Sequence, residues 1–186
     1  MISSVDHLIV VVRDLNKAII DYEKILGISP CWKGKHSELG TINAVFNLEN
    51  IYLELLSPGS MGSGTEFINS LLDKKGDHLA GIALGTDNIE LVKETLNKEG
   101  HEVDITSGQA TSEEEGSIRR WKNIFLPTSL SKELFIFIIE HTEGCFSEYE
   151  YEDISRVKKL DHVVINTKNA DNFISIYRDI YKIRLA

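Results

Sequence analysis

The two ends of the chain carry the same sequence pattern. Residues 5–29 align with residues 160–184 at a constant offset, and an Asp-His pair ending at His7 falls on a second Asp-His pair ending at His162. The other matching residues recur at the spacing of residues on one face of a helix. A weaker copy of the pattern occupies residues 79–100. Because a repeat determines the architecture of a chain, this sequence is expected to start the same structural unit three times.

Each copy begins with a strand pattern and continues with a helix pattern. In the first copy, the β-branched run 8–12 favours a buried strand, Asp14 is a candidate N-cap, and Gly27 is the expected end of the helix. In the second copy, the strand is expected at 79–86, with Asp87 as the cap of the helix that follows.

Further strands are expected after each helix. The segments 41–48 and 50–56 alternate, so one face of each packs on the first helix, and Glu54 lies on the opposite face. Strand patterns return after the second helix at 117–126 and 133–140. The last of these is almost continuously apolar, which is typical of a strand buried on both faces.

This pattern divides the chain into units. We expect a first module at 1–58, a linker with a short helix at 59–76, a second module at 77–142, an acidic linker at 143–159, and an incomplete third module, a strand and a helix, at 160–186. A lone strand and helix leave a sheet edge uncovered. The third module is therefore expected to dock on the other two, to exchange with a neighbouring chain, or to belong to a longer protein.

Composition excludes several functional classes. The chain has 29 acidic against 20 basic residues and a net charge of −9, which disfavours nucleic acid as a partner. It has no apolar run long enough to cross a membrane and no signal-peptide pattern, so a cytoplasmic location is expected. Cys31 and Cys145 form no metal-binding or redox motif. Serine-hydrolase, P-loop and dinucleotide-binding motifs are also absent from the sequence.

Two βαβββ units, with histidine early in the first strand and glutamate in the last, resemble the vicinal oxygen chelate superfamily. This superfamily includes glyoxalase I, extradiol dioxygenases and bleomycin-resistance proteins. The resemblance is carried by DHLIVVVRDLNKAIIDYEKILG and GTINAVFNLENIYLELLSP, and residues 34–58 are most similar to glyoxalase-like domain proteins. It covers residues 4 to about 141 as a pair of modules and 160–186 as the start of a third.

The resemblance implies an α+β fold, in which paired βαβββ modules form a curled mixed-sheet cup with helices outside, plus the βα start of a third module. It also implies a divalent metal (Mn, Fe, Ni or Zn) held by one residue from the first strand and one from the last strand of each module. His7 and Glu54 match these positions in the first module, and His78 and Glu140 are the candidates in the second. A strand register ending in His141 would instead turn Glu140 outward.

Candidate substrate-binding residues lie beside the same strands: His36, Thr41, Asn43, Arg120 and Trp121. Polar side chains on a cup face are suited to hold substrate oxygens, although those near Gly40 also suit a turn. Strand alternation lets either Arg119 with Trp121, or Arg120 alone, point inward. An inward arginine is suited to bind a carboxylate.

These features predict a metal-dependent lyase, isomerase or dioxygenase acting on a small substrate with vicinal oxygens. In such an enzyme Glu54 and Glu140 are the candidate catalytic carboxylates. One alternative is a metal-free small-molecule binding protein, similar to the bleomycin-resistance proteins. Another is an inactive N-terminal part of a longer protein similar to extradiol dioxygenases. The expected partner is a small molecule, and a homodimer is one arrangement in which the modules pair.

Overall fold

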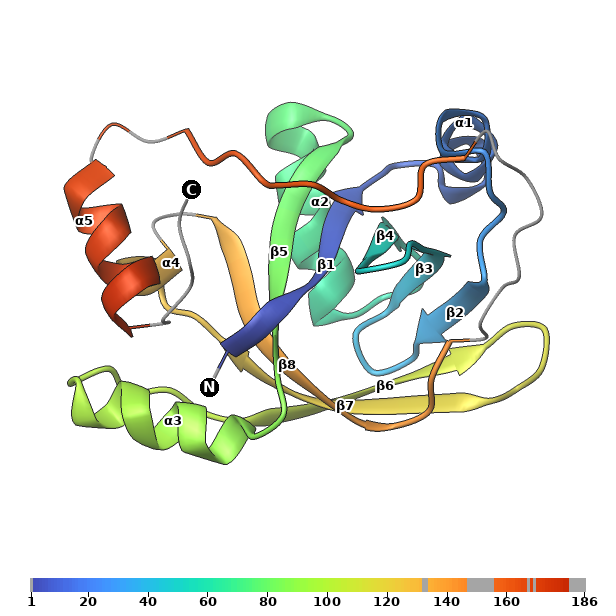
Figure 1. Ribbon diagram of the computed structural model, residues 1–186. Helices are drawn as coiled ribbons and strands as arrows, with labels where there is room; N and C mark the ends of the chain where they lie inside the picture. The colour runs from blue at the N-terminus through green and yellow to red at the C-terminus, as the bar shows by residue number, and fades with distance from the viewer. Residues whose placement is uncertain (1, 132–133, 147–155, 167, 169, 181–186) are drawn as a thin grey trace.

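Eight strands close into one barrel in the computed structural model of the chain (Figure 1). The structure describes residues 2–131, 134–146, 156–166, 168 and 170–180. The strands are β1 (Ile2–Val11), β2 (Trp32–His36), β3 (Thr41–Asn47), β4 (Tyr52–Pro58), β5 (His78–Thr86), β6 (Thr106–Ser112), β7 (Ile118–Phe125) and β8 (Phe135–Glu143). The helices are α1 (Leu15–Leu26), α2 (Ser63–Lys75), α3 (Ile89–Lys98), α4 (Thr128–Ser131) and α5 (Ala170–Ile174), which continues as the π-helical segment Ser175–Ile180.

The barrel consists of two halves with the same topology. Its strand order is β1-β4-β3-β2-β6-β7-β8-β5, and β5 pairs with β1 to close it. The first and last strands of each half are parallel neighbours, β1 with β4 and β5 with β8. The α+β fold predicted from the sequence, a curled mixed sheet of paired βαβββ units with helices outside, is confirmed. Both halves come from one chain.

Helix α1 begins and ends where the sequence predicts. The side chain of Asp14 accepts a hydrogen bond from the Lys17 amide, and Gly27 adopts a left-handed conformation with φ of 71°. Helix α3 differs by one residue, because the side chain of Asn88, rather than Asp87, accepts from the Leu91 amide. An amide oxygen caps a helix as well as a carboxylate does.

Two short strands, β2 and β6, have no strand pattern in the sequence. Their sequences, WKGKH and TSGQATS, lack apolar alternation. In β2, a Cβ at Gly34 would lie 2.3 Å from the indole nitrogen of Trp32, so glycine there lets the ring fold back over the strand. Tertiary packing rather than local propensity therefore places these strands.

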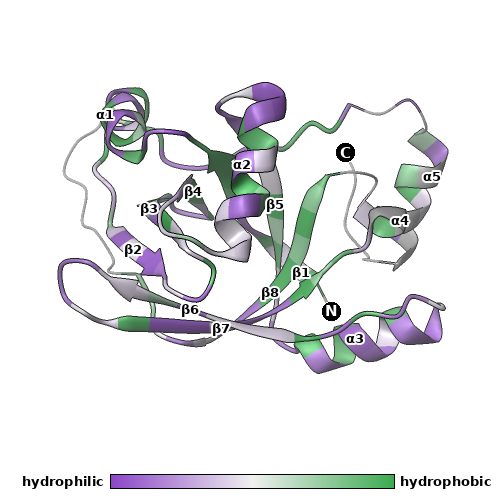
Figure 2. Ribbon diagram, turned by 180° about the vertical axis from the view of Figure 1, so that it is seen from behind, coloured by the Kyte–Doolittle hydropathy of each residue, from purple (hydrophilic) through white to green (hydrophobic). Residues whose placement is uncertain are grey.

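Each half has its own helix-packed core. Helix α1 buries Ala18, Ile19 and Leu26 against β3 and β4, including Phe46 and Leu55. Helix α3 packs similarly against the other half of the barrel. Figure 2 shows hydrophobic stretches along β1 and β8, whereas α3 alternates between hydrophobic and hydrophilic around its axis. No helix in the described part of the chain has the length and apolarity that a bilayer span requires.

The third repeat keeps its helix but not its strand. Residues 157–166 have no sheet pairing, since a closed barrel offers no free edge. The segment is held instead by loop contacts, with the Val157 amide donating to Leu26 and the Asn50 side chain bonded to the backbone of Leu160. Parts of the predicted linker and third module, residues 147–155 and 181–186, lie outside the described residues.

Helix α5 docks on the second half of the barrel. Figure 1 shows the preceding segment crossing the molecule from α1 to α5, which lies beside α4. Phe173 and Tyr177 stack on each other with ring centroids 4.3 Å apart, and both are buried in the α3 core cluster. Docking on the other two units was one of the three arrangements expected for the third repeat, and the helix of this repeat docks in that way.

This docking predicts a stability cost when the buried ring is removed. We expect Phe173→Ala to lower the free energy of unfolding by about 3 to 5 kcal/mol, because it leaves a cavity beneath α5. Urea denaturation measures the change. Val164→Ala, at a position 79% exposed, is the control and is expected to stay within about 0.5 kcal/mol of the wild type. Equal midpoints for all three proteins would contradict the docking.

Candidate functional site

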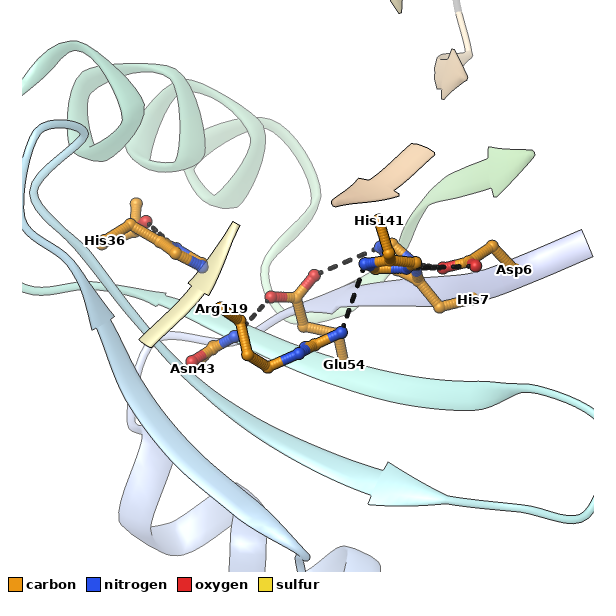
Figure 3. Close-up of polar contacts among 8 residues, drawn as sticks. Asp6, His7, His36, Asn43, Glu54, Arg119 and His141 are labelled. Atoms are coloured by element: carbon orange, nitrogen blue, oxygen red, sulfur yellow. Dashed lines mark hydrogen bonds and ion pairs between the residues drawn. The ribbon is translucent and has the colours of Figure 1, made fainter. Parts of the chain in front are cut away.

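A cavity of about 460 Å³ lies inside the barrel. Helix α2 contributes to its wall together with strands of both halves. Most of the wall is apolar, and its large aromatic members are Tyr52, Phe67, Trp121, Phe125, Phe135 and Phe137. Polar side chains gather in one part of the wall, as Figure 3 shows. The cavity therefore combines a large apolar surface with a compact polar cluster, as small-molecule sites do.

The register of β1 on β4 places a histidine beside a glutamate in this cluster. His7 pairs with Tyr52 and Ile9 with Glu54, so the two polar side chains reach the cavity from neighbouring strands. His7 Nε2 lies 3.5 Å from Glu54 Oε2. Asn43, on β3, donates from Nδ2 to the other carboxylate oxygen of Glu54 at 2.7 Å. All three are buried, and the carboxylate is thus held from both sides.

Asp6 fixes the orientation of the His7 ring. A bulge between Val5 and His7 interrupts the pairing of β1 with β5, which lets consecutive residues reach one cluster. His7 Nδ1 donates to Asp6 Oδ1 at 2.7 Å, which leaves Nε2 facing Glu54. Burial alone would raise the pKa of Asp6, but hydrogen bonds from His141 and His7 outweigh burial and hold that pKa well below its usual range.

His141 and Arg119 extend this network from the second half. His141 Nε2 lies 3.2 Å from both Asp6 oxygens, and its Nδ1 lies 3.3 Å from Arg119 Nη2. A guanidinium can only donate, so Nδ1 accepts and Nε2 donates to Asp6. A continuous series of polar contacts therefore connects Arg119, His141, Asp6, His7 and Glu54, as Figure 3 shows.

Arg119 is a buried cation surrounded by aromatic rings. Its side chain belongs to a residue only 7% exposed, and its guanidinium carbon lies 3.5 Å from the ring centroid of Phe146. Tyr52 and Trp32 lie further away, at 5.8 and 5.9 Å. Such contacts stabilise a guanidinium through the ring faces. The Nε atom of Arg119 is buried and has no hydrogen-bond partner.

His36 and Thr41 form a separate buried pair in the cavity wall. His36 Nδ1 lies 2.8 Å from the Thr41 hydroxyl, and the His36 ring meets Trp121 edge to face at 5.6 Å. Burial is the main cause that lowers the pKa of His36; Arg119 and His7 lower it further, while Glu54 opposes them. His36 therefore favours its neutral form.

The structure brings together most of the residues singled out from the sequence. His7, Glu54, His36, Thr41, Asn43 and Trp121 all line the cavity. Their metal-binding, catalytic and substrate-binding roles stay predictions. The alternation of β3 and β4 places Glu54 and Asn43 opposite the α1 face, because Phe46 and Leu55 pack on that helix.

Three predicted site residues lie elsewhere. His78 does not line the cavity, and its Nδ1 lies 2.8 Å from the Gly76 carbonyl. Glu140 accepts a hydrogen bond from the Ile89 amide at the start of α3, because β8 continues to His141 and its alternation turns residue 140 toward the helix. Arg120 is exposed and paired with Glu143, since alternation along β7 turns Arg119 and Trp121 inward instead.

Sequence reasoning missed Asp6, Arg119 and His141 as members of the cluster. The sequence allowed two registers for each of the strands that carry Arg119 and His141. One register of each strand turns these residues inward, but the sequence alone did not decide between the two. Asp6 had no such signal, because a strand without the bulge would turn it away from the side that His7 occupies.

The second half carries no metal ligand at the two positions that correspond to His7 and Glu54. The β1–β4 ladder starts at His7 with Tyr52, and the β5–β8 ladder starts at Gly81 with Phe135. The counterparts of His7 and Glu54 are therefore Gly81 and Phe137. A Cβ at Gly81 would lie 2.7 Å from atoms of Phe135, so the position admits no larger residue.

The donor set does not fit the metal implied by the superfamily resemblance. Catalytic zinc and non-haem iron sites commonly use three protein ligands, whereas His7 and Glu54 supply two. Within the described residues, no group of three or more His, Cys, Asp or Glu side chains is arranged to hold a metal ion. The buried Arg119 guanidinium adds a permanent positive charge to the same cluster.

Fold and site together define a protein of the vicinal oxygen chelate superfamily: two βαβββ halves in one barrel, with histidine and glutamate on the first and last strands of the first half. A family model described as a glyoxalase-like domain matches residues 5–181. The chain belongs to this family. No curated protein matches its sequence.

Solved structures share the fold at low sequence identity. Methylmalonyl-CoA epimerase from Mycobacterium tuberculosis is 20% identical with a TM-score of 0.59, over 76% of this chain and 90% of that one. The Streptomyces coelicolor enzyme in complex with 2-nitronate-propionyl-CoA is 18% identical with a TM-score of 0.57, over 75% and 97%. A hypothetical protein from Staphylococcus aureus is 19% identical with a TM-score of 0.60, over 76% of this chain and 60% of that one.

The buried state of His36 predicts a pH dependence of stability. Because its folded pKa lies below the unfolded value of about 6.5, the unfolded chain binds more protons as pH falls through that value. Stability is therefore expected to fall from pH 7 to pH 5, with His36 contributing at most about 1.4 kcal/mol per pH unit.

Thermal or urea unfolding across this pH range measures the effect. His36→Gln is expected to flatten the slope, and His162→Gln, which changes an exposed histidine, is expected to leave it unchanged. Equal slopes for both variants and the wild type would contradict the assignment.

Proposed function

We propose that this protein is an enzyme that moves a proton on a small molecule with adjacent oxygens, using His7 and Glu54 in the barrel cavity. The observation that carries the proposal is the short distance, 3.5 Å, between His7 Nε2 and Glu54 Oε2 in the cavity wall. An imidazole nitrogen and a carboxylate oxygen can each hold a proton. Because Asp6 occupies the other ring nitrogen, the pair is arranged to take up and release a proton.

Glu54 is the residue that we place on the substrate. One of its oxygens is fixed by Asn43, while the other faces His7 in a largely apolar cavity. A carboxylate held in this way keeps its position while a proton moves to or from a carbon beside a carbonyl group. His7 then exchanges the proton with Glu54, and Asp6 keeps the imidazole oriented throughout.

An isomerase or lyase is the reaction class that this arrangement favours. Two of the structurally similar proteins are named as methylmalonyl-CoA epimerases, and epimerisation at a carbon beside a carbonyl is a proton transfer of this kind. The expectation of Mn, Fe, Ni or Zn is not part of the proposal, because the cavity supplies only half of the ligand pattern. A dioxygenase is not proposed either, because non-haem iron oxygenases bind their iron through three protein ligands.

A second candidate function is binding without turnover. The aromatic wall of the cavity favours it, because such a surface holds an apolar ligand whether or not chemistry follows. The two functions differ in one observable property, the exchange of a carbon-bound proton with solvent.

Proton exchange tests the proposal directly. We expect the wild type, incubated in D₂O with a panel of 2-hydroxy acids and thiol adducts of 2-oxoaldehydes, to introduce deuterium beside the carbonyl of at least one member. NMR measures the rate. Glu54→Gln is expected to lower it by about 100-fold or more, because the base is lost.

Glu140→Gln is the matched control, since it removes a carboxylate that lies outside the cavity. Exchange at the wild-type rate in Glu54→Gln would overturn the proposal. Thermal stabilisation by a panel member without any exchange would favour the binding function instead.

A further inference from the structure

We infer that Arg119 binds the carboxylate of the molecule in the cavity, and that Asn43 accepts a hydrogen bond from a hydroxyl on the neighbouring carbon. The ligand class is thus a small 2-hydroxy carboxylic acid with an apolar substituent. The inference rests on the proposed function for the choice of cavity, and its charge and hydroxyl preferences are tested separately from turnover.

Arg119 is a buried charge that lacks a carboxylate partner among the described residues. The ion pairs formed by these residues include Arg13, Arg120 and Arg156 but not Arg119. The two carboxylates of the cluster have other partners, Asp6 with two histidines and Glu54 with Asn43 and His7. A buried guanidinium stays charged, and burying it unpaired is unfavourable. An anionic ligand would supply the missing charge.

One edge of the guanidinium lacks an acceptor. Nη2 of Arg119 is engaged with His141, and the ring of Phe146 covers a face of the group, but the buried Nε has no acceptor. A carboxylate binds a guanidinium in its plane through parallel N–H···O hydrogen bonds. The unpartnered Nε–H is therefore where a carboxylate oxygen is expected to bind.

Asn43 has a buried acceptor without a donor, whereas Arg119 has a buried donor without an acceptor. Its Nδ2 donates to Glu54, which fixes the amide orientation, and its buried Oδ1 has no donor. Among the described residues that line the cavity, the fully buried polar atoms without a partner are thus one donor, Arg119 Nε, and one acceptor, Asn43 Oδ1; both residues lie in the polar cluster (Figure 3). A molecule with an anionic oxygen and a nearby hydroxyl satisfies both, and its apolar part then contacts Trp121 and Phe137.

The position of Arg119 also explains how the two halves differ. Gly81 and Phe137 leave the second half without counterparts of His7 and Glu54, yet β7 and β8 contribute Arg119 and His141 to the cluster. A fixed positive charge beside the substrate oxygens stabilises negative charge that develops on them. In this protein the guanidinium supplies that charge from within the chain.

Three probes that differ by single groups test the inference. Mandelate carries a carboxylate, a neighbouring hydroxyl and a phenyl ring. Mandelamide has an uncharged amide in place of the carboxylate, and phenylacetate lacks the hydroxyl. Calorimetry, or the fluorescence of Trp121 in the cavity wall, measures the affinities. We expect the wild type to bind mandelate roughly tenfold or more tightly than either analogue, because mandelamide lacks the negative charge that would pair with Arg119, and phenylacetate leaves the buried Asn43 oxygen without a donor.

Arg119→Met removes the guanidinium and keeps an unbranched apolar side chain, and Arg120→Met is the matched control on the outer face of the same strand. We expect Arg119→Met to lose the preference for mandelate over mandelamide and Arg120→Met to keep it. Equal affinity of the wild type for mandelate and mandelamide, including no binding of either, overturns the inference even if Arg119→Met fails to fold. Deuterium exchange that requires Glu54 while the charge preference is absent would retain the proposed function and reject only this inference.

Discussion

The parallel register of β1 on β4 is the constraint on which the site depends. It sets His7 beside Glu54, and closure of the barrel by β5 encloses both side chains in a largely apolar cavity. Because the wall of the cavity is largely apolar, each buried polar group in it needs a partner, and the network from Arg119 to Glu54 provides most of them. A slip of one residue in this register would turn His7 or Glu54 out of the cavity.

The two halves share a topology but contribute different chemistry. The first half contributes the carboxylate and imidazole that handle a proton, and the second contributes a guanidinium and the histidine that connects it to Asp6. Gly81 is the clearest mark of this divergence, since its packing against Phe135 admits no side chain where the first half carries His7. A duplicated unit thus forms one cavity with an acid-base side and a cationic side.

Sequence patterns predicted the fold because the repeat, the caps of α1 and the alternation of β3 and β4 are local signals. Alternation also placed Glu54 and Asn43 on one surface, and the superfamily resemblance added His7. The patterns did not identify Asp6, because a bulge brings it to the cluster, or the choice of Arg119 over Arg120, because strand register is set by partners distant in sequence. Residues 160–166, where the third repeat was expected to begin with a strand, have no sheet pairing, since closure of the barrel is a property of the whole sheet.

Metal content tests the central claim, that the positive charge in this cavity comes from Arg119 rather than from a divalent ion. The protein would be purified without chelator or metal-affinity resin, offered Mn, Fe, Ni and Zn separately, and analysed by mass spectrometry of the elements. We expect far less than one ion per chain, with no difference between the wild type and His7→Ala. Near-stoichiometric metal in the wild type that is lost in His7→Ala would contradict the account.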